Sequence, residues 1–328
     1  MIRKVNALTI DVEDYFHIHA FSNVITQSNW DYLESRVETN THQILDILDK
    51  ANSPDIKPRA TFFVLGWIAE RHPALVREIH SRGHEVACHG YKHQCVFKQR
   101  RKEFRENVRK AKGILEDLIG VKVIGYRAST FSITKETMWA LSILYELGFR
   151  YDSSIFPINH HVYGFPGAPR LPFSIDFSHG DIISQMKKPK YLHEAKKTNQ
   201  RDGGISGNYE LMPTSHNQNQ QRAPDSLFFE FPLSTISPLG FNLPCSGGAY
   251  FRILPYWYTR WGLRKINKNN PGPAVFYIHP WELDPTLPKI NNVSLLSRFR
   301  TYTNLKSTVS RFNRLLNDFS FAPLASMI

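Results

Sequence analysis

Apolar positions in the first half of the chain alternate between short runs and helical stripes. Residues 5–10 and 60–65 are largely apolar runs of the length of a buried strand. Between them, residues 34–51 repeat apolar side chains at helical spacing, with Val37, Ile44, Leu45 and Leu48 on one face. Alternation of this kind is typical of parallel βαβ units.

The alternation continues to about residue 152. Further helices are expected at residues 67–80, 102–119 and 134–147, and further strands at 84–88, 121–126 and 149–151. Pro73 stands where a new helix could begin, and Gly120 is expected to end a helix. The pattern predicts an α/β fold built on a parallel sheet.

Polar side chains come directly after several predicted strands. Asp11, His89, Arg127 and Asp152 each follow the end of one. A last strong strand at residues 274–278 is followed by His279. Because the active site of such folds lies at the carboxyl ends of the strands, these side chains are expected to meet there.

Residues 89–93 read His-Gly-Tyr-Lys-His and are a candidate metal site. Two histidines four residues apart can present both imidazoles on one helical face to one ion. A carboxylate from the cluster Asp11-Val12-Glu13-Asp14 would be the third ligand, leaving one position open for water. Gly90 and Tyr91 occupy the place where the metalloprotease motif carries its base. Asp11 is therefore the expected base.

The cysteines offer an alternative metal site. Cys88 and Cys95 flank the histidine motif, and Cys245 is the third cysteine of a chain with too few for a disulfide framework. A Cys/His zinc site is disfavoured, because the adjacent Cys88 and His89 would point to opposite sides of an extended chain.

The composition is that of a globular protein with a basic balance. The 328 residues are 41% hydrophobic, and the formal net charge is +12. This charge fits an ordinary basic enzyme, or a surface for an anionic polymer or membrane leaflet. No motif of a common nucleic-acid-binding module is present, so no nucleic-acid partner is expected. No signal peptide and no apolar run of about 18 residues is visible, which predicts a cytoplasmic protein, at most peripheral to the inner membrane.

One domain is expected over residues 1–328, with two unusual segments. Residues 177–226 are rich in Lys, Asn, Gln, Gly and Ser and predict a polar, flexible insertion. Residues 294–319 predict one basic amphipathic helix. Its apolar stripe, which contains Leu295, Phe299, Leu305 and Phe312, is expected to pack on the core; docking to an anionic membrane or an assembly protein is the alternative.

With these motifs in order, the chain resembles the polysaccharide deacetylases of the NodB-homology family, carbohydrate esterase family 4. It is most similar to the exosortase-associated deacetylases of exopolysaccharide gene clusters. The motifs that carry the resemblance lie at residues 8–16, 60–66, 89–94, 126–128, 151–157, 247–252 and 276–282. The resemblance implies a distorted (β/α)7 barrel and metal-dependent removal of N-acetyl groups from amino sugars of a polysaccharide or its precursor.

The resemblance also implies roles by position. Asp11 matches the base, His89 and His93 the metal ligands, Arg127 the arginine that orients the base, and His279 the general acid.

The third ligand is a carboxylate of the first motif. It commonly follows the base directly, but Val12 holds that place here. Glu13 or Asp14 must therefore serve, and Glu13 is favoured by analogy with members that read Asp-x-Asp or Asp-x-Glu. Zinc suits this ligand set, and other transition metals also fit.

Other residues are assigned less directly. Asp152 falls near the motif that tunes the acid histidine, and Glu282 is interpreted as a local salt-bridge partner. Ser129 replaces a proline of the family, which is expected to loosen the loop behind the arginine. Tyr91, Tyr250 and Trp281 are candidates for sugar binding, and core packing remains open for the last two.

Three function classes stay open. A polysaccharide N-deacetylase is favoured. A related hydrolase on the same barrel would act on a cyclic imide, a formyl group or a lipid-linked sugar. A catalytically weak carbohydrate-binding member of an assembly is the third, and the retained base, acid and ligand set argues against it.

Overall fold

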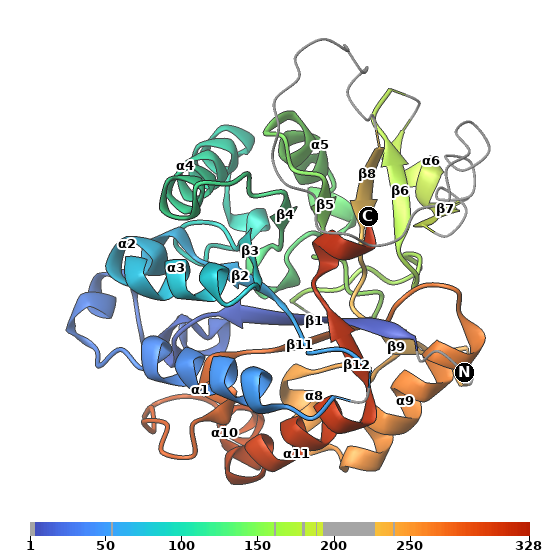
Figure 1. The fold of residues 1–328 in the computed structure, drawn as a ribbon. Helices are drawn as coiled ribbons and strands as arrows, with labels where there is room; N and C mark the ends of the chain where they lie inside the picture. The colour runs from blue at the N-terminus through green and yellow to red at the C-terminus, as the bar shows by residue number, and fades with distance from the viewer. Residues whose placement is uncertain are drawn as a thin grey trace.

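A computed structural model describes residues 4–53, 55–160, 162–178, 181–187, 189–192, 227–238 and 240–328. One curled sheet runs through this part of the molecule (Figure 1). Its strands are β1 (Val5–Val12), β2 (Thr61–Val64), β3 (Glu85–Cys88), β4 (Gly125–Tyr126), β5 (Tyr151–Asp152), β6 (Phe173–Asp176), β7 (Lys190–Tyr191), β8 (Leu227–Glu230), β11 (Val275–Ile278) and β12 (Ser320–Ala322). A small separate hairpin is formed by β9 (Thr235–Ile236) and β10 (Leu243–Pro244).

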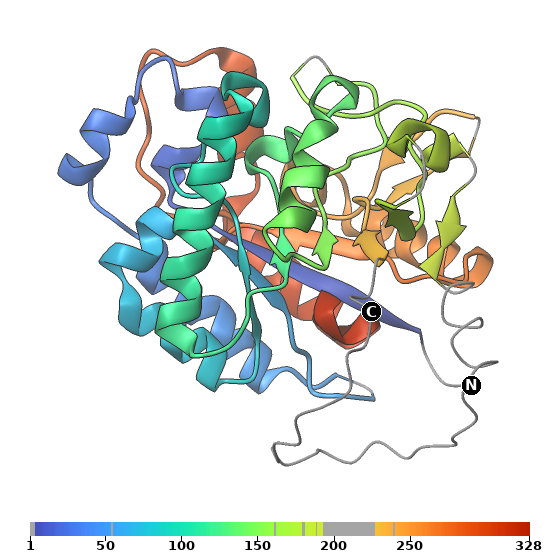
Figure 2. The same ribbon diagram turned by 90° about the horizontal axis from the view of Figure 1, so that it is seen from above.

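Helices surround these strands, as Figures 1 and 2 show. They are α1 (Val37–Lys50), α2 (Gly66–Arg71), α3 (Pro73–Ser81), α4 (Arg101–Ile119), α5 (Trp139–Glu146), α6 (Ile182–Lys187), α8 (Gly248–Ile253), α9 (Tyr256–Asn269), α10 (Leu295–Tyr302) and α11 (Leu305–Asp318). Short 3-10 helices include η1 (Tyr15–His17), η4 (Val96–Lys98) and η7 (Pro280–Leu283).

The strand order is β11-β1-β2-β3-β4-β5-β8-β6-β7. From β11 to β8 every pairing is parallel, and β6 and β7 add antiparallel strands at the end. Strands buried on both faces need nearly continuous apolar runs, which is why the sequence pattern located them. The predicted α/β fold of the distorted-barrel type is confirmed.

Strand β1 pairs with three other strands, β11, β2 and β12. Its register sets Ile10 beside Ile278 of β11 and Val12 beside Val64 of β2. The short strand β12 pairs with the first half of β1, the part that β2 leaves free. Consequently the residues that follow β1, β3, β4 and β11 emerge together at one end of the sheet.

Two predicted helices are each divided in the structure. Pro73 begins α3 and separates it from α2, because proline has no N–H to continue the first helix. The segment 294–319 forms α10 and α11, which are separated at Asn304, whose φ is +60°. The expected packing holds for Leu305 and Phe312 of α11, which are buried, but not for α10.

Most of the expected insertion at residues 177–226 lies outside the described residues. Its described part includes α6 and β7, and β7 pairs with β6. Among the described residues, no helix is both long and apolar enough to cross a membrane.

Candidate active site

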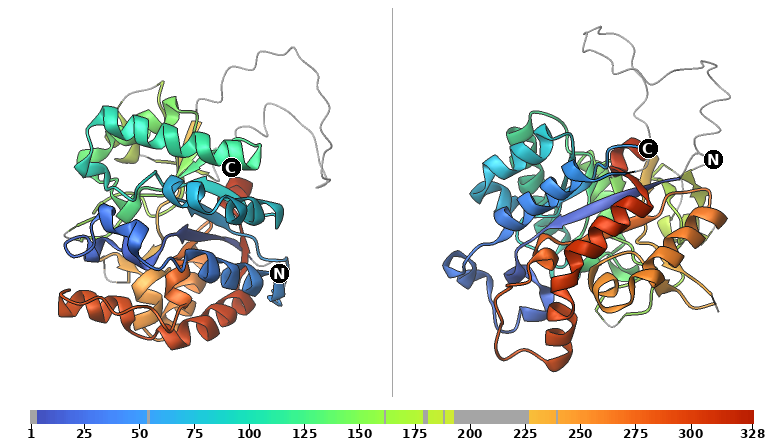
Figure 3. Two further views of the ribbon diagram at one scale, coloured as in Figure 1. Left: turned by 90° about the vertical axis from the view of Figure 1, so that its left-hand side faces the viewer. Right: turned by 60° about the horizontal axis from the view of Figure 1, so that its bottom comes forward.

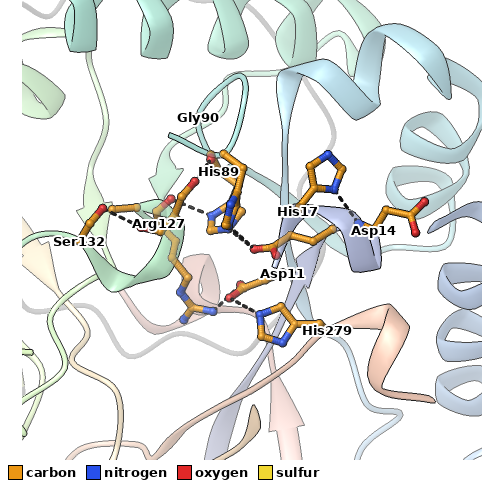
Figure 4. Close-up of polar contacts among 12 residues, drawn as sticks. Asp11, Asp14, His17, His89, Gly90, Arg127, Ser132 and His279 are labelled. Atoms are coloured by element: carbon orange, nitrogen blue, oxygen red, sulfur yellow. Dashed lines mark hydrogen bonds and ion pairs between the residues drawn. The ribbon is translucent and has the colours of Figure 1, made fainter. Parts of the chain in front are cut away.

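Asp11 is buried near the carboxyl end of β1 and contacts two other candidate residues (Figure 4). Its Oδ1 accepts a hydrogen bond of 2.7 Å from Nη1 of Arg127. Its Oδ2 lies 3.9 Å from Nε2 of His279, which follows the neighbouring strand β11. The structure therefore brings Asp11, Arg127 and His279 together as the sequence predicted.

Arg127 is fully buried and held on every side of its guanidinium group. Nη1 also donates to Oγ1 of Thr9 at 2.7 Å, and Nε and Nη2 donate to the carbonyl and hydroxyl oxygens of Ser153 at 2.8 Å each. The hydroxyl of Ser129 donates to the His89 carbonyl oxygen at 3.3 Å. These contacts argue against the loosening that was expected from Ser129.

Glu13, His89 and His93 form a compact cluster beside Asp11. Oε1 of Glu13 lies 2.8 Å from Nε2 of His89 and 2.9 Å from Nε2 of His93. All three ligand atoms lie within 4.8 Å of one another. Burial raises the pKa of Glu13, but the charge of His93 and hydrogen bonds from both histidines outweigh it and hold that pKa well below its usual value.

The two histidines do not lie on a helix, so that expectation is wrong. Residues 89–93 form a loop after β3, in which Gly90 has φ +77° and His93 has φ +48°. The carbonyl oxygens of Gly90 and Tyr91 accept hydrogen bonds from the N–H groups of Gly66 and Trp67, at the start of α2. The left-handed residues and this docking turn both imidazoles toward Glu13.

The hydrogen bonds of His89 test whether the cluster suits a metal. Nδ1 of His89 lies 2.9 Å from the carbonyl oxygen of Arg127, which can only accept, so Nδ1 carries the proton. Nε2 of His89 then faces the carboxylate of Glu13, where either a proton or a metal ion can lie between the two atoms. One carboxylate with two imidazoles is a ligand set of catalytic zinc sites, so the cluster fits such a metal.

Asp14 belongs to a different part of the structure. Oδ1 accepts from the Tyr15 N–H, and Oδ2 accepts from Ser35 Oγ and from the N–H groups of Arg36 and Val37, at 2.7–3.1 Å. It caps η1 and ties that turn to the start of α1. Among the described residues, the metal-ligand cluster therefore contains Glu13 and not Asp14.

Glu282, which the sequence suggested as a local salt-bridge partner, pairs with His279 and Arg252. Nδ1 of His279 lies 2.8 Å from Oε1 of Glu282, and the other oxygen of Glu282 accepts 2.6 Å from Nε of the buried Arg252. Burial lowers the pKa of His279, but Glu282, Glu13 and Asp11 raise it to about 9. The spacing of three between His279 and Glu282 was the signal that could have revealed this pair.

Asp152 does not take the place expected beside His279. Its carboxylate accepts from the N–H and hydroxyl of Ser154 at 3.0 and 2.6 Å. On the neighbouring strand it is in register with Glu230, and burial raises the pKa of both carboxyl groups. Asp152 thus makes contacts at the end of β5, and Glu282 is the carboxylate that contacts His279.

A pocket of about 370 Å³ opens over the site. Its lining includes Asp11, Glu13, His93 and His279, together with Ile18, His19, Phe131, Tyr163, Tyr250, Trp281, Leu296 and Arg300. The ring of Trp281 stacks on His279 with centroids 5.3 Å apart. Two of the three expected sugar-binding residues, Tyr250 and Trp281, thus face the pocket.

Tyr91 does not line this pocket. Its hydroxyl donates to Glu70 at 2.5 Å, and the Lys110 ammonium lies 3.6 Å from its ring centroid. The side chain thus packs between α2 and α4, and the role of Tyr91 in sugar binding stays a prediction without support from this pocket.

Known proteins match two parts of the chain. Residues 25–151 match the family model for polysaccharide deacetylases, and residues 203–328 match a domain of unknown function, DUF3473. A peptidoglycan deacetylase-like protein, FGM2, of Gibberella zeae is 30% identical over 128 residues, which are 38% of this chain and 36% of that protein. The peptidoglycan-N-acetylglucosamine deacetylase of Bacillus cereus is 39% identical over 74 residues, 23% of this chain and 26% of that protein.

The matched part of the chain is thus similar in sequence to polysaccharide deacetylases. The matches to the two relatives cover only about a third and a quarter of the relatives' lengths. The deacetylase model covers His89, His93 and Arg127, whereas His279 and Glu282 fall in the second matched segment.

Two solved structures share the fold of this chain. A Mycobacterium smegmatis protein predicted to be a polysaccharide deacetylase has a TM-score of 0.54 at 17% identity, over 100% of this chain and 93% of its own. The PuuE allantoinase has a TM-score of 0.50 at 13% identity, over 98% and 87%. At these identities the likeness concerns the fold alone.

Proposed function

We propose that this protein is a metal-dependent hydrolase that removes N-acetyl groups from the amino sugars of a polysaccharide or its precursor. The observation that carries the proposal is the convergence of Glu13, His89 and His93 with Asp11 and His279 at one pocket. A base, an acid and a metal-ligand set within one small volume are what amide hydrolysis needs.

The metal would be held by Glu13, His89 and His93. When bound there, a divalent ion such as zinc supplies polarisation of the acyl carbonyl group and acidification of water. Asp11 accepts the proton of the attacking water, and Arg127, which also donates to Thr9, keeps its carboxylate aimed at the pocket. The 2.7 Å bond from Arg127 leaves Oδ2 of Asp11 directed toward His279.

His279 supplies the proton that the departing amine nitrogen needs. With its pKa raised to about 9, the imidazole is protonated at neutral pH, which suits a general acid. Glu282 accepts from Nδ1 and so directs Nε2 toward Asp11 and the pocket. Base and acid thus hold opposite protonation states in one site.

The aromatic pocket lining supports a saccharide substrate. Tyr250 and Trp281 contribute aromatic side chains to this lining, and aromatic rings present apolar surface to sugars. The names of the two curated relatives favour an N-acetylated glycan. The resemblance to exosortase-associated members favours an exopolysaccharide or its precursor as that glycan.

Acetate release tests the proposal. Zinc-loaded protein should release acetate from N-acetylated chito-oligosaccharides but should not open allantoin or cleave N-formyl amides. Asp11→Asn should keep its metal, measured by elemental analysis, while turnover falls by about 10²–10⁴-fold, as for loss of one acid–base group. Metal-loaded wild-type protein that binds the oligosaccharides without releasing acetate would be a binding protein and would refute the proposal.

A further inference from the structure

Helix α10 lies at the outer edge of the molecule (Figure 3), and several of its apolar side chains are exposed. Leu295, Leu296 and Phe299 are 83%, 61% and 53% exposed. Together with the exposed Arg298, they are called the α10 face below. A group of large apolar side chains in water marks a surface with a partner.

The charge of the surrounding segment indicates an anionic partner. Residues 285–317 contain six basic residues and no Asp or Glu; the six are Lys289, Arg298, Arg300, Lys306, Arg311 and Arg314. The acidic residues at either side are already engaged. Asp284 pairs with Arg36 at 3.0 Å, and Asp318 pairs with Arg260 at 3.1 Å.

The α10 face combines basic and apolar side chains, and this combination distinguishes between two kinds of anionic partner. A hydrated polysaccharide would pair with the arginines but would leave the leucines and phenylalanine in water. A bilayer with anionic headgroups accommodates both, because the apolar side chains enter the acyl boundary while the arginines meet phosphates. We propose that the α10 face docks this protein on the surface of an anionic lipid bilayer.

Docking in this way would set the pocket against the membrane. Leu296 of the α10 face also lines the pocket, as does Arg300 on the same helix. The end of the helix is held in place by Arg252, which donates to the carbonyl oxygens of Arg300, Thr301 and Thr303 at 2.7–3.1 Å. The α10 face is therefore presented by a fixed helix at the pocket mouth.

A second basic face is the rival docking surface. On α9, Trp257 and Trp261 are 65% and 41% exposed, and Arg264 and Lys265 lie beside them. This face does not line the pocket over the candidate site. Variants of α9 therefore test whether membrane binding, if it occurs, belongs to α10.

Co-sedimentation of the full chain with vesicles tests the proposal. Wild-type protein should bind vesicles of phosphatidylglycerol and phosphatidylcholine and bind phosphatidylcholine alone much more weakly. Leu295→Asp/Phe299→Asp should lower the partition coefficient at least about tenfold, since it replaces apolar contacts by repelled charges. The control is Phe97→Asp/Val121→Asp, which adds the same two negative charges outside the α10 face. These two apolar residues are 42% and 49% exposed, and the control should bind vesicles like wild type.

Several results would overturn the proposal. They are failure of the wild type to bind anionic vesicles, wild-type binding by the α10 double variant, and loss of binding in Trp257→Ala/Trp261→Ala alone. Binding to dextran sulfate without binding to vesicles would assign the surface to an anionic polymer instead. If the double variant lacks the wild-type circular dichroism spectrum, Arg298→Glu provides the same test. The measurement is of binding alone, so its outcome is independent of deacetylase activity.

Discussion

At the scale of single residues, Arg127 contacts both halves of the candidate site. Its guanidinium group donates to Asp11, and its carbonyl oxygen lies 2.9 Å from Nδ1 of His89. One residue thus aims the proposed base and fixes the tautomer of a proposed metal ligand. A short shift of Arg127 would disturb both.

We predict that His89→Ala loses the metal and the activity together, because the cluster keeps only Glu13 and His93. Elemental analysis of the purified protein should give about one zinc ion per wild-type chain and much less in the variant. His42→Ala is the control, since His42 pairs with Glu78 away from the cluster. Full zinc occupancy in His89→Ala would show that the ligands lie elsewhere.

The His279–Glu282 pair predicts a pH dependence. The pKa of His279 is raised from 6.5 to about 9, so the acid form, and with it kcat/KM, should be lost as the pH rises through about 9. Because the pKa of His279 is raised in the folded state, the pair contributes its full stability to the fold below pH 6.5. This contribution is lost as the pH rises to about 9.

Glu282→Gln should move the alkaline limb of kcat/KM to lower pH. Glutamine keeps the shape of the side chain but removes its charge, whereas the burial that lowers the pKa of His279 remains. The pH–rate profile measures the shift, and zinc content should stay at the wild-type level. An unchanged alkaline limb would mean that His279 is not the acid.

At the scale of elements, the loop of residues 89–93 provides both histidines of the candidate metal cluster. It follows β3, bends at Gly90, and docks its carbonyl oxygens on the first N–H groups of α2. These hydrogen bonds pair otherwise free N–H groups at the N-terminus of α2. They hold the loop in place, although it contains no helix or strand. The position of His93 therefore depends on α2 as much as on β3.

We predict that Gly90→Ala lowers the free energy of unfolding by about 1 kcal/mol, because only glycine adopts φ +77° without strain. Space is not the cause, since the nearest atom to an added Cβ is Asn107 Oδ1 at 3.5 Å. Gly113→Ala, inside α4 and with nothing within 4 Å, should instead stabilise by up to about 1 kcal/mol. Urea unfolding measures both, and equal effects would refute the role of φ.

At the scale of the whole molecule, β1 joins distant parts of the chain. It pairs with β2, with β11 and with the late strand β12. Phe321 of β12 is fully buried against Phe276 and Phe319, far along the sequence from β1. The stability of the sheet around β1 thus depends on residues far along the sequence.

Phe321→Ala should therefore lower the free energy of unfolding by about 3–5 kcal/mol, the usual cost of emptying a buried phenylalanine site. Phe299→Ala is the matched control, since this ring on α10 is 53% exposed and its loss should change stability by less than about 0.5 kcal/mol. Urea denaturation compares the two variants. Similar values would mean that β12 is not part of the cooperative core.

The sequence by itself determined the α/β class, the approximate place of the central strands and which polar residues follow them. Strands buried on both faces consist of apolar runs, and helices that pack on the sheet have apolar residues at helical spacing. Both can therefore be recognised in the sequence. Asp11, His89, Arg127 and His279 could be identified because each follows such a run. The motif resemblance added Glu13 in preference to Asp14.

Only the tertiary structure decided which of these polar groups touch. Glu13 and His89 are 76 residues apart, and Glu282 rather than Asp152 contacts His279. Tyr91 faces away from the pocket, and the stripe of residues 294–319 divides into a buried and an exposed part at Asn304. Loop paths and side-chain directions follow from long-range packing and from single left-handed residues, and neither leaves a periodic trace in the sequence.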